Sequence, residues 1–122
     1  MLKAILLVGS GSFLGGVSRY LVSALMKGNA SGFPWATLTV NLLGCFIIGL
    51  AGGLIAKFSG PSNNWSLLAI TGFCGSFTTF STFAKDSVAM LQANNIAGFA
   101  LYIAVSVIVG IALTAFGWWL VK

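Results

Sequence analysis

The chain has 122 residues, of which 58% are hydrophobic and only 6% are charged, and its formal net charge is +5. Soluble domains carry about 25% charged residues, so this composition excludes an ordinary soluble protein and indicates an integral membrane protein. Histidine is absent and Asp86 is the only carboxylate side chain, which leaves no acid–base couple, no catalytic triad and no closed metal site, and predicts that the protein is not an enzyme. The six basic residues are scattered singly and predict no nucleic-acid partner.

Four apolar stretches each approach the roughly 20 residues that a membrane-spanning helix needs. They cover residues 4–26, 35–56, 65–91 and 96–121. The connections between them are short and rich in turn-forming residues, and they cover residues 27–34, 57–64 and 92–95. We therefore expect an all-α membrane protein with a single four-helix transmembrane domain over residues 1–122.

The first span contains a cation, Arg19, about two turns from its end, a position that costs a few kcal/mol unless the side chain reaches the interface or faces water. Two interpretations stay open, which are snorkelling to the membrane surface and a vestibule that attracts anions. Gly11 and Gly15 are four residues apart, as are Gly49 and Gly53 in the second span, and such pairs predict close helix packing.

The second span has polar side chains at every second position, namely Thr37, Thr39 and Asn41. Thr37 and Asn41 share one face of a helix, whereas Thr39 points elsewhere. A carboxamide in hydrocarbon needs a partner, so Asn41 either joins neighbouring helices or binds a ligand. Cys45 and Cys74 also fall inside predicted spans and are interpreted as small packing residues.

The third span contains the most unusual stretch of the chain, residues 72–83. It combines two glycines, five hydroxyl side chains and four phenylalanines. Glycine costs roughly 1 kcal/mol in a helix interior, and backbone groups freed at membrane depth must find other partners. The stretch therefore predicts a broken third helix and, at the break, an ion or substrate site. Phe80 and Phe83 would share one face of the helix that follows, flanked by Ser81 and Thr82.

The fourth span is apolar except for Tyr102, Ser106 and Thr114, and the first two share one face because they are four residues apart. Together the spans offer hydrogen-bond donors without carboxylates, which suits an anion. Phenyl ring edges carry partial positive charge and can accept a small anion in a narrow path. Packing of the rings in a helix core is the alternative.

These motifs resemble those of the CrcB/Fluc fluoride channels over the whole chain. The motifs are Gly72-x-x-Gly75-x-x-Thr78-Thr79-Phe80-Ser81-Thr82-Phe83, Thr37-Leu38-x-Val40-Asn41-x-x-Gly44 and Gly15-Gly16-x-x-Arg19-Tyr20. The resemblance implies a passive channel that exports fluoride from the cytoplasm across the bacterial inner membrane. The anion path it implies consists of Asn41, Phe80, Phe83, Ser81, Thr82, Thr39, Tyr102 and Ser106.

The same resemblance implies vestibules near Arg19 and Asp86, and a structural sodium ion held at a dimer centre by the backbone carbonyls of Gly75 and Thr78. Three positions depart from the usual family pattern: Ser76 and Ala36 stand where glycine is common, and Asp86 where glutamate is usual. Ser76 bears most directly on the cation site because it follows Gly75.

The distribution of basic residues predicts an antiparallel homodimer. Four spans place both termini on one side of the membrane, and each side carries three basic residues. One side has Lys3, Lys57 and Lys122, and the other has Lys27, Lys85 and Arg19. Because lysine and arginine near span ends set orientation, an even balance predicts that both orientations insert. A parallel dimer or a monomer is the alternative.

Two other functions are alternatives to a channel. A small four-span proton-coupled exporter of cationic compounds has similar length and hydrophobicity, but it needs a carboxylate within its first span, where this chain has Arg19. A structural subunit of a larger membrane complex would leave Asn41 and the broken span without a role.

Overall fold

The computed structural model describes residues 1–26, 33–58 and 64–121, and these residues are helical with no strand among them. The elements are α1 (Leu2–Leu25), α2 (Trp35–Phe58), the π-helix η1 (Ser66–Cys74), α3 (Gly75–Phe77), α4 (Phe80–Gln92) and α5 (Ile96–Leu120). Four segments are long and apolar enough to cross a membrane, and η1, α3 and α4 together form the third of them. The expected all-α, four-span class is confirmed. Most of the predicted connections at 27–34 and 57–64 lie outside the described residues.

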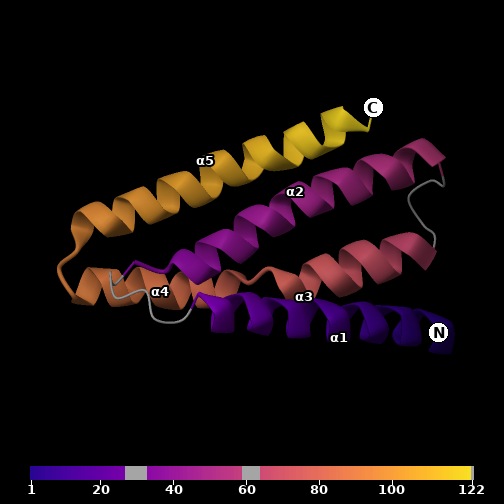
Figure 1. Cartoon of the computed structure of the whole chain (residues 1–122), viewed down its shortest axis with the longest axis horizontal. Coiled ribbons are helices and arrows are strands. Elements are labelled where there is room, and N and C mark those ends of the chain that lie inside the picture. The colour runs from indigo at the N-terminus through magenta and orange to yellow at the C-terminus, as the bar shows by residue number, and fades with distance from the viewer. Residues whose placement is uncertain (27–32, 59–63, 122) are drawn as a thin grey trace.

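The four spans lie side by side, as Figure 1 shows. Helix α2 lies between α5 and the third span, and α1 packs along η1 and α3 on the other side. Helix α4 packs against the first half of α5. The start of α1 and the end of α5 lie at the same end of the bundle (Figure 1).

Small residues allow the helix backbones to approach closely at two contacts, as the sequence predicted. Between α2 and α5, a methyl group placed on Gly49 would overlap the carbonyl oxygen of Thr114. Between α1 and the third span, a methyl group on Gly11 or Gly15 would overlap the backbone carbonyl of Leu68 or Phe73, respectively. Gly11 and Gly15 therefore allow α1 to lie close against η1.

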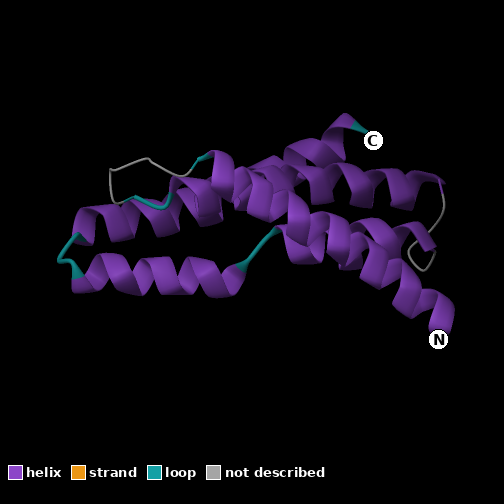
Figure 2. Cartoon of the chain, turned by 60° about the horizontal axis from the view of Figure 1, so that its bottom comes forward, coloured by secondary structure: helices purple, strands orange, loops and turns teal. Residues whose placement is uncertain are grey.

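The third span is broken, as predicted, and the break is visible as the loop between its two halves in Figure 2. The break falls at Thr78 (φ −86°, ψ 161°) and Thr79 (φ −149°, ψ 120°), both of which are extended. Gly75 is helical, with φ −60° and ψ −32°. The two threonines suit this geometry because β-branched side chains favour extended backbone over helix. The break thus lies just beyond the glycines that predicted it.

A tight turn joins α4 to α5 and allows the two helices to pack against each other. Asn94 adopts a positive φ of 59°, which asparagine tolerates better than most residues. The side chain of Asn95 then caps α5 by accepting a hydrogen bond from the Gly98 N–H at 3.0 Å. This turn brings Tyr102 of α5 against Phe83 of α4, with ring centroids 5.0 Å apart.

Candidate functional site

The break is held from one side by Asn41 of α2. The Asn41 Nδ2 group donates a hydrogen bond to the Thr79 carbonyl at 3.1 Å, and the Thr79 N–H donates to Asn41 Oδ1 at 2.9 Å. The carboxamide therefore satisfies both backbone polar groups of an extended residue at membrane depth. An Nδ2 group has two hydrogens, so this pairing uses only one of its donors.

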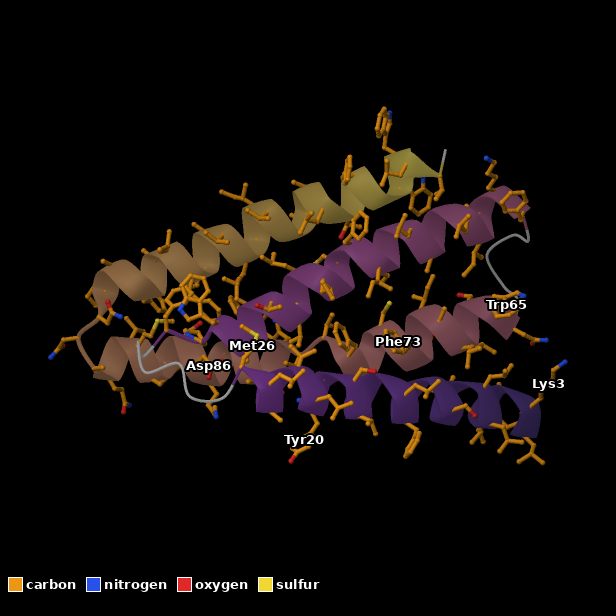
Figure 3. The ribbon with its side chains drawn as sticks, viewed as in Figure 1. Lys3, Tyr20, Met26, Trp65, Phe73 and Asp86 are labelled. Atoms are coloured by element: carbon orange, nitrogen blue, oxygen red, sulfur yellow. The ribbon has the colours of Figure 1, made fainter. Side chains whose placement is uncertain are left out.

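Arg19 of α1 holds the break from the other side. Its Nε donates to the carbonyl of Ser76 at 3.1 Å, and the Ser76 hydroxyl donates to the carbonyl of Ser12 at 2.7 Å. The neighbouring Tyr20 points away from the bundle (Figure 3) and is 69% exposed. Arg19 thus reaches the last turn of α3. Ser76, which departs from the usual family glycine, uses its hydroxyl to join the third span to α1.

The break frees the two carbonyls that were expected to hold a cation. In an α-helix the N–H of residue i bonds to the carbonyl of residue i−4, so Gly75 would pair with Thr79 and Thr78 with Thr82. Instead, the Thr79 N–H bonds to Asn41, and the Thr82 N–H bonds to the side chain of Thr79 at 3.2 Å. The carbonyls of Gly75 and Thr78 consequently have neither of these helical partners.

Phe80 and Phe83, the two phenylalanines predicted to share one face of α4, contact each other. The ring centroids of Phe80 and Phe83 are 5.7 Å apart, and the rings are tilted by 49°. Their surroundings differ, because Phe83 also contacts Tyr102, whereas Phe80 is 79% exposed in the single chain. Phe83 therefore belongs partly to the core, and Phe80 does not.

A cavity of about 330 Å³ lies beside the break. It is lined by Asn41, Gly44, Cys45, Ile48, Cys74, Thr78, Thr79, Phe80, Phe83, Ser106 and Val107. None of these residues carries a charge. Five of them were predicted site residues: Asn41, Phe80, Phe83 and Ser106 of the anion path, and Thr78 of the cation site. The Ser106 Oγ is buried without a hydrogen-bond partner in the described part of the chain. A buried hydroxyl of this kind can donate to a small bound group.

The other predicted site residues lie outside this cavity. Thr39 lines a separate apolar groove with Leu42 and Phe116. The Tyr102 ring is fully buried, and its hydroxyl donates to Asp86 Oδ2 at 3.5 Å, a distance at which a hydrogen bond is weak. Asp86, labelled in Figure 3, borders a second pocket of about 320 Å³.

Ser81 and Thr82 lie at the start of α4, close to the cavity but not in its lining. The Ser81 hydroxyl is 3.4 Å from that of Thr79, and the Thr82 backbone N–H is capped by the same threonine. Thr79 is the residue that sequence reasoning missed. The sequence did indicate this role, because a threonine directly before a helical stretch is a favoured N-cap.

These features define a class of protein: a four-span membrane protein whose third span is broken beside an uncharged, donor-lined cavity. The sequence model of the family described as "CrcB-like protein, Camphor Resistance (CrcB)" matches residues 6–118. The chain belongs to this family.

Several relatives are similar over nearly their whole length. A protein of Azobacteroides pseudotrichonymphae named "Fluoride-specific ion channel FluC" is 44% identical over 97% of this chain and 95% of its own. A protein of the same name from Chlorobium phaeobacteroides is 42% identical over 98% of this chain and 93% of its own. "Fluoride-specific ion channel FluC 2" of Bacillus thuringiensis is 42% identical, with 92% of each chain covered.

Proposed function

We propose that the protein is a passive, fluoride-selective ion channel in the plasma membrane, which lets fluoride leave the cytoplasm. The observation that carries this proposal is the cavity beside the break, where donors and phenyl rings meet and no carboxylate lies in the lining. Relatives at 42% to 44% identity carry the name fluoride-specific ion channel, which identifies the anion.

The break has an electrostatic polarity that suits an anion on the α4 side. Helix α4 starts at Phe80, and the N-terminus of a helix carries partial positive charge and unpaired N–H groups. The cavity beside it is lined by Asn41, whose Nδ2 group has a second donor, and by Ser106, whose hydroxyl is buried. These neutral donors can replace the water around a small anion without holding it as tightly as a lysine or arginine would.

The phenyl rings fit the same proposal. Phe80 and Phe83 both line the cavity, and a ring edge directed at the path presents partial positive charge. Both phenylalanines belong to the first turn of α4. The ring edges and the helix dipole would therefore act on the same ion. Thr39, Ser81, Thr82 and Tyr102 extend the proposed path beyond the cavity, with Arg19 and Asp86 near the vestibules.

The opposite side of the break suits a cation. Helix α3 ends at Phe77, and the C-terminus of a helix carries partial negative charge. The carbonyls of Gly75 and Thr78, which lack their usual helical partners, are oxygen ligands of the kind that hard cations prefer. We propose that they bind a structural sodium ion. Gly75 is exposed in the single chain, so a second copy can contribute the same pair of oxygens.

The proposed assembly is an antiparallel homodimer, in which a two-fold axis in the membrane plane brings the two broken spans together. The even balance of basic residues supports two orientations, although Lys27 and Lys122 lie outside the described residues. The exposure of Phe80 (79%) and Phe13 (70%) leaves apolar surface for a partner or lipid to cover.

Fluoride efflux from liposomes tests the function. Liposomes that contain the pure protein and potassium fluoride should lose fluoride rapidly when valinomycin lets potassium leave, while chloride stays inside. Equal loss of both anions would contradict selectivity, and retention of fluoride would contradict the channel. The exporter alternative predicts proton exchange driven by a cationic drug instead, but the only carboxylate side chain, Asp86, borders a pocket separate from the break.

A further inference from the structure

Two cysteines that the sequence suggested were packing residues line the same cavity. Cys45 belongs to α2 and Cys74 is the last residue of η1, and both are free thiols. Both border the cavity of about 330 Å³ beside the break. Cys45 is half-buried, whereas Cys74 is 2% exposed. Cysteines from two different spans thus border one cavity.

Both cysteines border the same cavity, whose lining is mostly apolar and carries no charge. In apolar surroundings a pair of thiolates is therefore stable only with a cation between them. Thiolates prefer soft metal ions. The described residues contain no group of three or more histidine, cysteine or acidic side chains that could hold a metal ion. The two thiols therefore do not suit an ion that needs three or four such ligands. Soft ions with filled d shells, such as Hg²⁺ and Ag⁺, are satisfied by two sulfurs.

We propose that Cys45 and Cys74 form a two-thiol site that binds a soft, two-coordinate metal cation inside the cavity. When Hg²⁺ binds, each thiol releases its proton to water and forms one sulfur–mercury bond, so one Hg²⁺ replaces two protons and no electron is transferred. The bound ion lies in the space bordered by Phe80, Phe83 and Ser106. It blocks fluoride passage there, a consequence that rests on the proposed function, whereas the binding does not.

Binding is tested with Hg²⁺ on the purified protein, in excess of a competing monothiol, by the absorbance of mercury–thiolate bonds and the metal content of the protein peak. The parent should retain one mercury per chain. Cys45→Ala and Cys74→Ala should each bind about 100-fold more weakly, because the second bond is no longer intramolecular. Methylmercury is the matched control, since it forms one bond, cannot bridge and should be removed by the competitor. Circular dichroism establishes that each variant is folded.

Flux supplies the second measurement. Hg²⁺ should stop fluoride efflux through the parent, a dithiol should restore it, and the Cys45→Ala/Cys74→Ala double variant should keep whatever efflux it shows before treatment. Retention of mercury by either single variant as tightly as by the parent would overturn the site. Tight binding of Hg²⁺ without loss of fluoride efflux would contradict the proposal that the bound ion blocks fluoride passage. A parent that passes no fluoride before treatment contradicts the proposed function, while the binding result stands independently.

Discussion

The carboxamide of Asn41 pairs with both backbone polar groups of Thr79, at 2.9 Å and 3.1 Å. Thr79 is extended in the middle of a span, where an unsatisfied N–H or carbonyl would cost several kcal/mol. Asn41 therefore makes the break possible, and by taking the Thr79 N–H it also frees the Gly75 carbonyl. One side chain on α2 thus connects the proposed anion path to the proposed cation site.

Asn41→Asp should abolish most fluoride flux. The carboxylate keeps an oxygen that can accept the Thr79 N–H, but its second oxygen faces the Thr79 carbonyl and its charge repels the anion. A unit charge at 4 Å is worth roughly 4 kcal/mol at an effective dielectric constant of 20, so we expect a loss of far more than tenfold in liposome efflux. Flux equal to the parent in a folded Asn41→Asp protein would remove Asn41 from the path.

Phe80→Ile and Phe83→Ile should both lower flux, because isoleucine keeps the bulk but removes the electropositive ring edge. Their stabilities should differ. Phe83 contacts Tyr102, and the loss of an aromatic pair lowers the free energy of unfolding by about 0.5–1.5 kcal/mol. Substitution of the exposed Phe80 should lower it less. Phe73→Ile is the matched control, since Phe73 stacks on Phe77 and does not line the cavity. Parental flux in both Phe80→Ile and Phe83→Ile would assign the rings to packing alone.

The spans and the existence of a break could be predicted because they depend on local composition. The exact position of the break could not. Gly72 attracted attention as a helix breaker, but it lies in η1, where a methyl group would come within 2.8 Å of the Val8 carbonyl. Close packing and a break both favour glycine, so the residue type cannot distinguish them. The Arg19 contact was equally hidden, because Ser76 is 57 positions away along the chain and only helix packing brings the two together.

Arg19→Ala should destabilise the protein by about 1–3 kcal/mol, because it removes a part-buried hydrogen bond from a charged donor. The group left unpaired is the Ser76 carbonyl, to which Arg19 Nε donates. Thermal unfolding in detergent measures the change. Ser76→Ala, which removes only the hydroxyl bond to Ser12, should cost about 0.5–1.5 kcal/mol. Arg19→Ala as stable as the parent would mean that the contact contributes nothing.

Removal of sodium should lower both the unfolding temperature and the fluoride flux. The carbonyls of Gly75 and Thr78 lack their helical partners, and a bound cation would satisfy them at membrane depth. A ligand that binds only the folded state stabilises it by about 2.7 kcal/mol at 100 times its dissociation constant. Exchange into N-methylglucamine buffer, followed by sodium titration, measures this effect. Lithium or potassium at equal ionic strength is the control, and an unchanged unfolding temperature would contradict the site.

Dual topology should appear as half-labelling at both ends of the bundle. Single cysteines replace Lys3, beside the start of α1, and Asn94, in the turn between α4 and α5, in a chain whose own Cys45 and Cys74 are replaced by alanine. The start of α1 and the turn between α4 and α5 lie at opposite ends of the bundle (Figure 1). If both orientations insert, an impermeant maleimide should label about half of each population in intact cells, because the basic residues favour neither orientation. Labelling after the cells are opened gives the total. Full labelling of one position and complete protection of the other would establish a single orientation, and with it a parallel dimer or a monomer.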